Sequence, residues 1–486
     1  MEKRLDYILT DIKTEAVIGS ADMQIEKIEF DSRELGKGDL FVAVKGTRTD
    51  GHNFIAAAIE KGAIAVICEE IPANAPEGVT FIRVKNSAVA LGQAAAAYYQ
   101  HSGKKLRVVG VTGTNGKTTT VFLLYQLYRE LGYQAGLLST IENRIGDERL
   151  KSTHTTANAL QIQKNLHRMA ESGCNYCFME ISSHAIDQER IAGLHIHGAI
   201  FTNITHDHLD YHQSFDRYIK AKKKLFDELP ASAFALVNRD DKHAQVMLQN
   251  TKAKKAAYSI KNISDFKGKI LENRFEGLHM RIEGQDFWSR LVGYFNAYNL
   301  MAAYGAAMLD GQKQEEVLLA LSGLQPVEGR FEVVPSNSGI IGIVDYAHTP
   351  DALQNVLETV NTGRSGNEHV LTIIGAGGDR DRTKRPLLAQ VACRYSDRVI
   401  LTSDNPRSED PEAIIREMEA GLSSEMKRKT VKITDRKEAI KTATMISVKG
   451  DIILLAGKGH ETYQEIKGQR HHFDDREILN EFLNQI

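Results

Sequence analysis

Apolar runs of strand length alternate with segments of helical spacing through the middle of the chain. Residues 106–111 (LRVVGV) form a run typical of a buried strand, and Val121, Leu124, Tyr128 and Leu131 then recur three or four positions apart. Further apolar runs lie at residues 135–138, 177–181 and 199–204. This alternation predicts a parallel sheet with helices on its faces.

The same alternation restarts after residue 327 and predicts a second α/β domain. Its strand candidates are residues 340–344, 370–374, 398–401 and 452–455. Before residue 105 the apolar runs are short, Gly-rich turns separate them, and the polar residues 100–105 indicate a linker. Two of these runs are residues 39–44 and 63–67. We therefore expect an α/β protein of three domains, at residues 1–104, 105–327 and 328–486.

Length and composition agree with a folded protein of several domains. The chain has 486 residues, and roughly 100–200 residues per domain gives about three. Lys and Arg total 61 against 63 Asp and Glu, so the net charge of -2 offers no general basic field for nucleic acid or anionic lipid. With 42% hydrophobic and 26% charged residues, the chain has the balance of a globular protein. Any anionic ligand must therefore be bound by a local site.

The sequence also favours a reducing compartment. Residues 1–6 (MEKRLD) lack the apolar core of a signal peptide, and no stretch approaches the roughly 20 apolar residues that span a bilayer. We expect a cytoplasmic protein with no membrane span, which agrees with only four cysteines in so long a chain. Cys174 and Cys177 form a single C-x-x-C pair, and we interpret them as buried residues at a strand end rather than as a zinc or redox motif.

Polar and Gly-rich motifs follow the predicted strands in both α/β blocks. In the C-terminal block they are residues 375–379 (GAGGD), 403–407 (SDNPR) and 457–461 (GKGHE). Open α/β sheets bind ligands at the carboxyl ends of their strands. Two such edges that face each other would form an active site between the domains.

The strongest local signal lies at residues 110–119 (GVTGTNGKTT), between a predicted strand and a predicted helix. Glycines let backbone N–H groups close around phosphate oxygens, Lys117 can reach the terminal phosphates, and the Thr118 hydroxyl can hold Mg²⁺. The match to G-x-x-x-x-G-K-[ST] is imperfect, because Val111 stands where the first Gly belongs. A Gly turn with a surface lysine is the alternative, but the order of strand, loop and helix favours a nucleotide site.

A nucleotide bound with Mg²⁺ needs further oxygen ligands. Two candidates lie at strand ends, Glu180 and the cluster at residues 205–212 (THDHLDYH). The histidines of this cluster could instead form a zinc site, which is disfavoured without a thiolate, or serve as turn residues, an interpretation that suits His206 and His212.

A mixed run of charges at residues 378–386 (GDRDRTKRP) could be a solvated loop. Because it follows a strand and a Gly-rich turn, it stands where a forked guanidinium would receive a carboxylate or phosphate. Residues 404–407 (DNPR) offer both charge signs, as a zwitterionic amino acid requires, although a plain turn explains them equally well.

Five segments together resemble, in order and spacing, the signatures of the Mur ligases, which are ATP-dependent enzymes that add amino acids to a cell-wall precursor. They are residues 112–119, 180–184, 203–212, 293–299 and 345–351. Residues 31–33 and 38–43 look like the family's nucleotide-sugar-binding domain. The resemblance implies a small N-terminal α/β domain for the UDP-sugar, a central P-loop ATPase-type parallel sheet for ATP, and a C-terminal Rossmann-like α/β domain for the amino acid.

The resemblance also assigns residues on the nucleotide side. ATP would be bound by Thr112, Gly113, Thr114, Asn115, Gly116, Lys117, Thr118, Thr119, Asn296, Asn299, Arg330 and Asp345. Mg²⁺ would be organised by Thr118, Glu180, His208 and Lys222, and the catalytic set would be Lys117, Glu180, His208 and Lys222. Lys222 aligns with the family's carbamylated lysine, in which CO₂ addition turns a cation into a carboxylate ligand for a second Mg²⁺. From pattern alone, the lysine-rich run around it would be a solvated helix face, and Lys223 and Lys224 crowd the position.

On the substrate side, the chain is similar to the member that adds meso-diaminopimelate to UDP-N-acetylmuramoyl-L-alanyl-D-glutamate. The UDP-sugar dipeptide would be bound by Ser32, Thr155, Thr156, Ser182, Gln188 and Arg190, although His154 and Ala157 depart from the Asn and Pro of many relatives. Diaminopimelate would be bound by Arg380, Asp404, Asn405, Pro406, Arg407, Gly457 and Glu461. The Arg407 guanidinium can pair with the carboxylate that diaminopimelate carries and lysine lacks, which favours diaminopimelate.

The implied activity is an ADP-forming carboxylate–amine ligation through an acyl phosphate, in peptidoglycan precursor synthesis, by a monomer that acts on small molecules and not on nucleic acid. One alternative is a ligase of the same family with another acceptor, such as lysine or glutamate. Another is a nucleotide-dependent switch or binding protein, which needs the phosphate loop but not residues 404–407 and 457–461.

Overall fold

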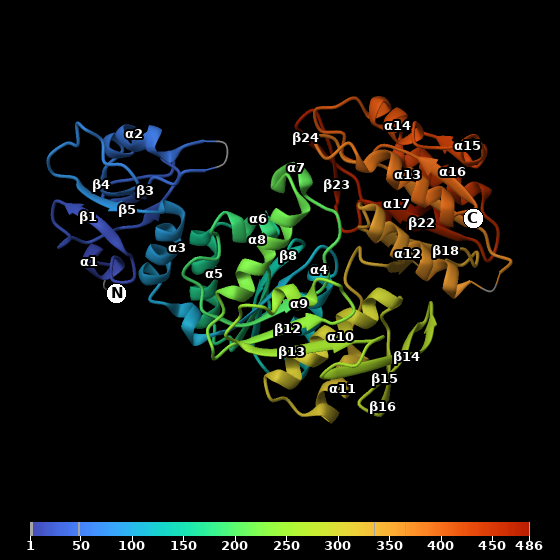
Figure 1. Ribbon diagram of the computed structural model, residues 1–486. Helices are drawn as coiled ribbons and strands as arrows, with labels where there is room; N and C mark the ends of the chain where they lie inside the picture. Colours follow the sequence, from blue (N-terminus) through green and yellow to red (C-terminus); the bar gives the residue numbers. More distant parts are fainter. Residues whose placement is uncertain (1–2, 47–48, 153, 335, 365, 486) are drawn as a thin grey trace.

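The computed structural model describes residues 3–46, 49–152, 154–334, 336–364 and 366–485. It contains three large sheets that follow one another along the chain, each covered by helices on both faces, and one two-stranded sheet (Figure 1). The expected α/β class with parallel sheets is confirmed. The exact domain limits at residues 104 and 327 stay a prediction.

The N-terminal sheet has the strand order β1-β5-β4-β3-β2. Its strands are β1 (Thr14–Ile18), β2 (Ile28–Glu29), β3 (Asp39–Val42), β4 (Ala63–Cys68) and β5 (Thr80–Val84). Its helices are α1 (Leu5–Ile8), the 3-10 helix η1 (Gly51–Phe54), α2 (Ile55–Glu60) and α3 (Ser87–Tyr98). Alternate strand residues pack on α3 on one face and on α2 on the other, which explains the short but fully apolar runs.

The central sheet is the largest, with the order β16-β15-β14-β13-β12-β11-β6-β10-β7-β8-β9. Its strands are β6 (Arg107–Thr112), β7 (Ala135–Leu138), β8 (Glu142–Ile145), β9 (Glu148–Lys151), β10 (Tyr176–Glu180), β11 (Ile196–Phe201), β12 (Phe234–Asn238), β13 (Lys254–Ser259), β14 (Phe266–Arg274), β15 (Gly277–Ile282) and β16 (Gln285–Ser289). The middle strands are parallel, and antiparallel strands extend both edges. Parallel strands buried on both faces read as continuous apolar runs, and this is why the sequence revealed them.

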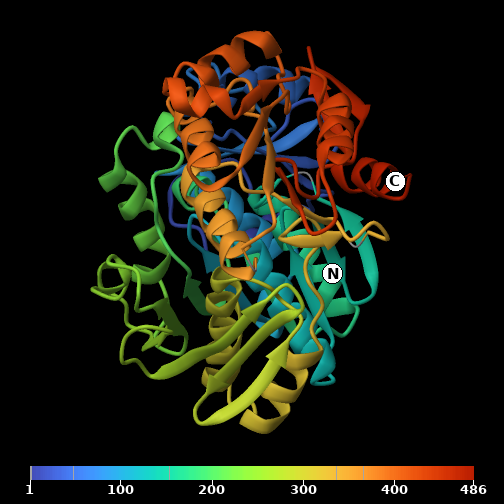
Figure 2. The same cartoon turned by 90° about the vertical axis from the view of Figure 1, so that its right-hand side faces the viewer.

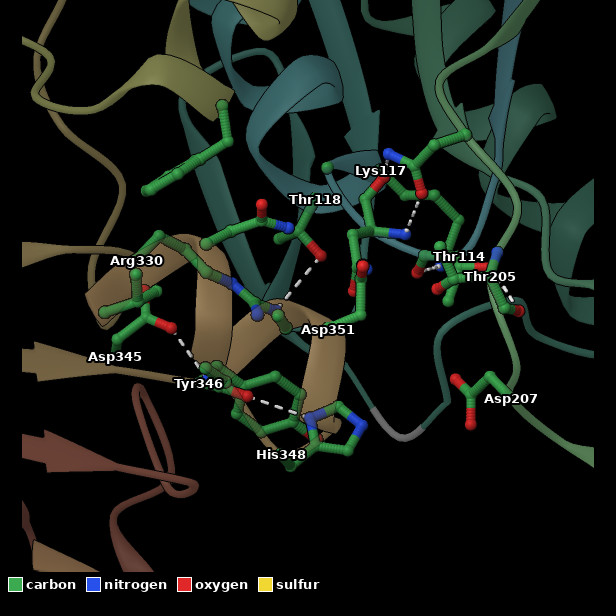
Figure 3. Close-up of a pocket in the computed structure, with 18 of the residues that line it drawn as sticks. Thr114, Lys117, Thr118, Thr205, Asp207, Arg330, Asp345, Tyr346, His348 and Asp351 are labelled. Carbon is green, nitrogen blue, oxygen red and sulfur yellow. Dashed lines mark hydrogen bonds between the residues drawn. The ribbon is translucent and has the colours of Figure 1, made fainter. Parts of the chain in front are cut away.

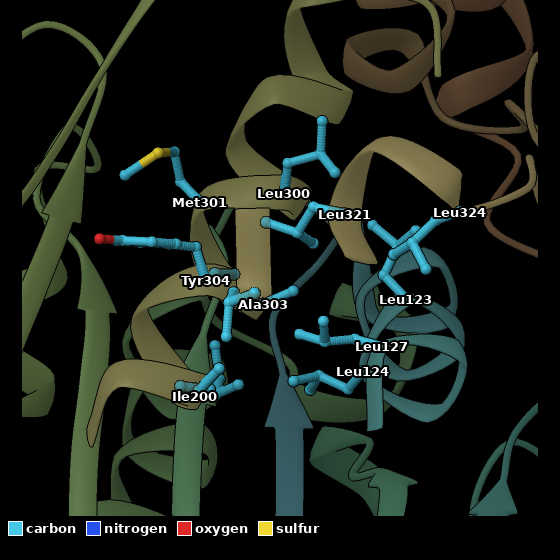
Figure 4. Close-up of a cluster of buried hydrophobic side chains, with 14 of the residues drawn as sticks. Leu123, Leu124, Leu127, Ile200, Leu300, Met301, Ala303, Tyr304, Leu321 and Leu324 are labelled. Atoms are coloured by element: carbon cyan, nitrogen blue, oxygen red, sulfur yellow. The ribbon is translucent and has the colours of Figure 1, made fainter. Parts of the chain in front are cut away.

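Helices cover the two faces of this sheet. They are α4 (Lys117–Glu130), α5 (Ala159–Glu171), α6 (Ser183–Asp187), α7 (Leu209–His212), α8 (Phe215–Asp227), α9 (Ala244–Met247), α10 (Tyr294–Leu309) and α11 (Gln314–Gly323). Leu123 and Leu127 of α4 pack against Leu300 of α10 and Leu321 of α11 in one buried cluster (Figure 4). Helices α5, α8 and α9 pack on the opposite face. The phosphate-loop helix α4 is therefore held rigidly by apolar contacts.

The C-terminal sheet has the order β17-β18-β22-β19-β20-β21, with β17 antiparallel to its neighbour. Its strands are β17 (Glu332–Val334), β18 (Ile341–Asp345), β19 (Val370–Ile374), β20 (Arg398–Leu401), β21 (Thr430–Lys432) and β22 (Ile452–Ala456), and a separate hairpin is formed by β23 (Tyr463–Ile466) and β24 (Gln469–His472). The helices are α12 (Pro350–Gly363), α13 (Lys384–Tyr395), α14 (Pro411–Glu419), α15 (Ser424–Arg428), α16 (Arg436–Ile446) and α17 (Asp475–Leu483). Figure 2 shows this domain, in orange and red, stacked against the green and yellow central domain.

The structure refines two sequence expectations. The apolar runs at residues 39–44 and 199–204 extend past their strands, which end at Val42 and Phe201. The polar residues 100–105, predicted as a linker, contain the 3-10 helix η2 (Ser102–Lys105), in which Ser102 and Gly103 are buried against α5. No helix in the described ranges is long and apolar enough to cross a bilayer.

Candidate functional site

A cavity of about 1280 Å³ lies between the central and C-terminal domains. Its walls come from the phosphate loop, the end of β10 and the loop after β11 on one side, and from the loops after β18, β19, β20 and β22 on the other. The expectation that two strand edges face each other across an interdomain site is therefore confirmed. Most of the predicted ligand-binding residues line this cavity (Figure 3).

The phosphate loop connects β6 to α4 and needs Gly at two positions. Gly113 has φ +155°, and a Cβ there would lie 1.9 Å from the Thr202 hydroxyl oxygen. Gly116 has φ +84°, and its Cβ would lie 2.6 Å from the Asn299 side-chain oxygen. Gly at these two positions therefore lets the loop pack directly on Thr202 and Asn299 just before the N-terminus of α4, the end of a helix that favours an anion.

Lys117 is folded back onto its own loop. Its Nζ donates hydrogen bonds to the carbonyl oxygens of Gly113, at 2.9 Å, and Thr114, at 2.8 Å. Burial lowers the pKa of Lys117, and the nearby charges of Glu180 and Asp207 oppose that shift. A lysine held by two carbonyls at the cavity wall can exchange them for phosphate oxygens without moving the backbone.

Arg330 reaches the same loop from the start of the C-terminal domain. Its Nη2 donates to the Thr118 hydroxyl at 3.2 Å, and the guanidinium carbon lies 4.3 Å from the centre of the Tyr346 ring (Figure 3). The Nε of Arg330 is buried without a hydrogen-bond partner. Asp345 accepts hydrogen bonds from the backbone N–H groups of Phe331 and Ala347, and burial raises the pKa of Asp345 to about 6.

Asn296 and Asn299 lie on the first turns of α10, and their side chains are buried. Asn299 Nδ2 donates to Asn296 Oδ1 at 2.9 Å, and Asn296 Nδ2 donates to the Val292 carbonyl at 2.7 Å. Asn299 reaches the cavity wall, whereas Asn296 lies behind it and orients the Asn299 amide.

Glu180 has the unpaired carboxylate oxygen that a Mg²⁺ ligand needs. It ends β10, is only 1% exposed, and accepts a hydrogen bond on Oε1 from the Thr140 backbone N–H at 2.8 Å. Its Oε2 is buried without a partner, which is costly for a carboxylate unless a cation or water completes it. Thr118 and His208 line the same cavity, and burial lowers the pKa of His208 to about 3, so that its imidazole is neutral and able to bind a metal. The described residues contain no group of three or more His, Cys, Asp or Glu side chains placed to hold a metal.

Lys222 lies on α8, directly behind the phosphate loop. Its side chain is 1% exposed, and its Nζ donates to the Gly113 carbonyl at 2.9 Å and lies 4.6 Å from the centre of the Tyr218 ring. Burial, together with the charge of Lys117, lowers the pKa of Lys222 well below its usual value. The expectation of a solvated helix face is wrong at this position. The spacing of Tyr218, Lys222 and Leu225, at i, i+4 and i+7, was the available signal.

The other histidines of the cluster are structural. His212 shares a hydrogen bond of 2.9 Å with the Ser183 hydroxyl, and His206 stacks on Phe215. Cys174 and Cys177 are buried free thiols, as expected of residues at a strand end.

A second polar wall lies beyond Glu180. The Thr156 hydroxyl donates to the Glu180 carbonyl at 2.8 Å and accepts from the Ser182 backbone N–H at 3.1 Å. Arg190 Nη1 donates to the Thr156 carbonyl at 2.9 Å, while Gln188 holds the other edge of this guanidinium. Thr155, Thr156, Ser182 and Arg190 line the cavity, but Gln188 and the distant Ser32 are not part of its wall.

The C-terminal wall combines both charge signs. Asp404, Asn405 and Glu461 are close together, and Asn405 Nδ2 donates to Glu461 Oε2 at 2.7 Å. Arg407 has φ +52°, and its backbone pairs with Ile466 at the end of β23. Gly457 has φ +110°, and a Cβ there would lie 2.8 Å from Asp404 Oδ2. Arg380 is exposed at the cavity mouth, and Pro406 does not reach the wall.

Sequence reasoning assigned no role to two lysines of the C-terminal domain. Lys384 forms an ion pair with Asp207 of the central domain, and Lys458 is a fully buried cation beside Glu461. Both lie inside motifs that the sequence revealed, but their partners are distant in the chain, so that spacing alone could not identify them.

Models of three protein-domain families match the chain in order. They are the Mur ligase family catalytic domain at residues 24–99, the Mur ligase middle domain at residues 111–307, and the Mur ligase glutamate ligase domain at residues 329–459. Together they cover most of the chain.

Full-length relatives have the same overall extent. The UDP-N-acetylmuramoyl-L-alanyl-D-glutamate–2,6-diaminopimelate ligase of Bacteroides fragilis is 53% identical over 481 residues, 99% of each chain. The ligase with the same name from Cytophaga hutchinsonii is 54% identical over 472 residues, 97% of each chain. A solved structure of a ligase with this name is 35% identical, with a TM-score of 0.71 over 99% of each chain. MurF ligase from Thermotoga maritima in complex with ADP shares the fold at 20% identity, with a TM-score of 0.63.

Proposed function

The chain belongs to the Mur ligase family, and we propose that it joins meso-2,6-diaminopimelate to the D-glutamate side-chain carboxylate of UDP-N-acetylmuramoyl-L-alanyl-D-glutamate at the expense of ATP. Relatives of this name are 51–54% identical over 96–99% of the chain. The observation in the structure that carries the proposal is a single cavity that joins a phosphate loop to a wall of both charge signs. The reaction is a cytoplasmic step of peptidoglycan precursor synthesis, carried out by a monomer.

The first chemical step activates the carboxylate. The D-glutamate side-chain oxygen attacks the γ-phosphorus of ATP, and the bond from that phosphorus to the β,γ-bridging oxygen breaks. The products are ADP and an acyl phosphate. Lys117 and the loop N–H groups hold the phosphates, and Arg330 neutralises charge from the opposite wall. Thr155, Thr156, Ser182, Gln188 and Arg190 are the residues that we assign to the dipeptide, with Ser32 assigned to the UDP-sugar in the N-terminal domain.

The second step forms the amide. The unprotonated amine of diaminopimelate attacks the acyl carbon, a tetrahedral intermediate forms, the bond from that carbon to the phosphate oxygen breaks, and phosphate leaves with the proton that the amine loses. Asp404, Asn405 and Glu461 hold the ammonium of the distal centre and Arg407 its carboxylate, while Arg380 at the cavity mouth receives the other carboxylate. Because the cavity lies between domains, their closure brings the amine to the activated carbon and excludes water.

Mg²⁺ would be held by Thr118, Glu180 and His208, together with a carbamate on Lys222, and would neutralise the charge of the phosphates. Carbamylation needs an unprotonated amine, which attacks CO₂ and releases one proton. The burial of Lys222 lowers its pKa and supplies that amine. Lys223 donates to Asp227 at 2.7 Å and Lys224 pairs with Glu189, so these two neighbours are engaged elsewhere.

The carbamate is tested separately from the reaction. After equilibration with ¹³C-bicarbonate, the wild-type protein should show a carbamate carbon resonance that Lys222→Met abolishes and Lys223→Met retains. A high-resolution density map at Lys222 should show the three added atoms. A resonance that persists in Lys222→Met would contradict the assignment.

An acceptor-dependence assay tests the function itself. With ATP and the UDP-sugar dipeptide, diaminopimelate should release ADP and give a tripeptide product far faster than L-lysine or glutamate. Preference for lysine would indicate a ligase of the same family with another acceptor. Nucleotide binding with no ADP release under any of these conditions would indicate a nucleotide-dependent switch.

A further inference from the structure

Lys458 is a buried cation behind the wall that we assign to the amino acid. Its side chain is 0% exposed and does not reach the cavity. Its Nζ donates to the Tyr463 carbonyl at 2.5 Å, to Asn405 Oδ1 at 3.4 Å and to Glu461 Oε2 at 3.4 Å. An ammonium group has three protons, so all of its donors are used, and two of the three acceptors are cavity residues.

These contacts determine which way the Asn405 amide faces. Asn405 Oδ1 accepts from Lys458 and from the Glu465 backbone N–H, the latter at 2.8 Å. With the oxygen committed to two donors, the Nδ2 must face Glu461, and it donates there at 2.7 Å. Lys458 therefore orients a side chain that it reaches from behind, and leaves the front of Glu461 open to the cavity.

Lys458 also balances the charge of the wall. Asp404 and Glu461 are neighbouring carboxylates, and burial together with the Asp404 charge raises the pKa of Glu461, an effect that Lys458 opposes. The other buried cation nearby, Arg436, donates from Nε and Nη2 to the two carboxylate oxygens of Asp475 at 2.8 and 2.6 Å. Among the described residues, Lys458 alone forms a direct ion pair with Glu461. Lys458 therefore offsets part of the negative charge that Asp404 and Glu461 bring to the cavity wall.

We propose that Lys458 is a positioning residue for the acceptor amino acid: it fixes Asn405 and Glu461 so that they receive one ammonium group, beside the Arg407 guanidinium that receives the adjacent carboxylate. This inference depends on the proposed function of the cavity. It adds that selectivity for a zwitterionic centre depends on a residue that never touches the substrate.

The test is a cycle of variants in the steady-state ligase assay. In Lys458→Met, the KM for diaminopimelate should rise roughly 10- to 100-fold, the range expected when a charged hydrogen-bonding group is lost, while the KM values for ATP and the UDP-sugar dipeptide change less than about 3-fold. In a Glu461→Gln background, the same Lys458→Met change should raise the KM for diaminopimelate clearly less than in the wild-type background, because only the contact of Lys458 with Asn405 remains. Lys441→Met, an exposed lysine of the same domain, is the matched control and should change nothing.

A structural role would give a different result. If Lys458 only stabilised the fold, Lys458→Met would lower kcat without a selective rise in the KM for diaminopimelate, or would change that KM equally in both backgrounds. Either result overturns the proposal. Lys458→Gln, which keeps a donor toward Tyr463, gives the same comparison should the methionine variant not fold. If the wild-type protein does not use diaminopimelate, the proposed function fails and this role falls with it. Unchanged KM in Lys458→Met with an active wild type overturns only the role of Lys458.

Discussion

Lys384 of α13 forms an ion pair with Asp207, a residue 177 positions earlier in the chain, across the gap between the central and C-terminal domains. The two side chains are 19% and 8% exposed. Burial alone would raise the pKa of Asp207, but its neighbours His208 and Lys384 keep it lowered. The pair therefore links the two walls of the cavity at the phosphate end.

Breaking this pair should loosen the contact between the two domains. We expect Lys384→Met to lower kcat about 10- to 100-fold and to increase the radius of gyration of the complex with a non-hydrolysable ATP analogue, because a buried carboxylate left unpaired costs about 3–5 kcal/mol. Asp207→Asn should lower kcat similarly. In the double variant, the logarithm of kcat should fall by less than the sum of the two single decreases. Small-angle scattering with kinetics checks this, and full additivity would contradict a direct link.

Removing the loop lysine should abolish turnover without disturbing substrate binding. Lys117→Ala should lower kcat at least ~10²- to 10³-fold, because one preorganised charge at the transferred phosphoryl group is lost. Calorimetric titration should show unchanged affinity for the UDP-sugar dipeptide, which we assign to the separate polar wall beyond Glu180. The exposed Lys164→Ala is the control, and near-normal turnover in Lys117→Ala would discard the phosphate assignment.

The loop glycine should tolerate no side chain. In Gly113→Ala, the new Cβ would lie 1.9 Å from the Thr202 hydroxyl oxygen at φ +155°, so that the loop must move and ATP binding should weaken more than 10-fold, by roughly 1.4 kcal/mol or more. Gly323→Ala provides a matched control, since nothing lies within 4 Å of its Cβ position. Fluorescent-nucleotide titration separates the two, and equal affinities would contradict the steric argument.

Asp310 should be important for the stability of the central domain. It accepts hydrogen bonds from the His197 and Tyr176 side chains at 2.9 and 2.6 Å, and from Arg107 at 2.9 Å, at the end of the sheet away from the cavity. Burial alone would raise its pKa, but these partners lower it from 3.8 to about 2. Asp310→Asn should lower the unfolding temperature by roughly 5–10 °C, because a buried charged network loses its acceptor.

The pH dependence of this effect follows from the sign of the shift. The folded-state pKa is depressed, so the stabilisation is complete above the unfolded value of 3.8 and is lost as pH falls toward 2. Wild type and Asp310→Asn should therefore differ by a constant amount from pH 8 to 5 and converge below pH 4, as followed by thermal unfolding. If the two unfolding temperatures converged near neutral pH instead, another titrating group would be responsible for the difference.

Arg407 should determine acceptor affinity rather than nucleotide affinity. Its guanidinium donates to the Gly378 carbonyl at 2.5 Å, and its backbone is held by Glu465 and Lys467. Arg407→Lys keeps the charge but loses the paired N–H donors with which a guanidinium binds a carboxylate. The KM for diaminopimelate should therefore rise far more than the KM for ATP. Arg470→Lys, an exposed arginine on the β23–β24 hairpin that pairs with the Arg407 backbone, should leave both constants unchanged. Equal increases of both constants in Arg407→Lys would contradict the assignment.

Local pattern was sufficient where burial is periodic. Residues 370–374 and 398–401 are strands with the predicted bounds, and the phosphate loop lies between β6 and α4 as its glycines indicated. Such features are encoded within a few neighbouring positions, since a strand buried on both faces is apolar throughout and a tight loop needs residues that tolerate positive φ. The order of the ligand-binding motifs could therefore be read directly.

Only the tertiary structure decided which side chains meet. It placed Lys222 inside the protein with an amine that protonates poorly, paired Lys384 with Asp207, and set Lys458 behind Glu461. The sequence does not distinguish a lysine on a solvated helix from a lysine in the protein interior. The pKa of its amine depends on burial and on partners contributed by other parts of the chain. The sequence by itself determined the three α/β sheets and the phosphate loop, while folding determined the charges, because electrostatic energy depends on distance and burial and not on position along the chain.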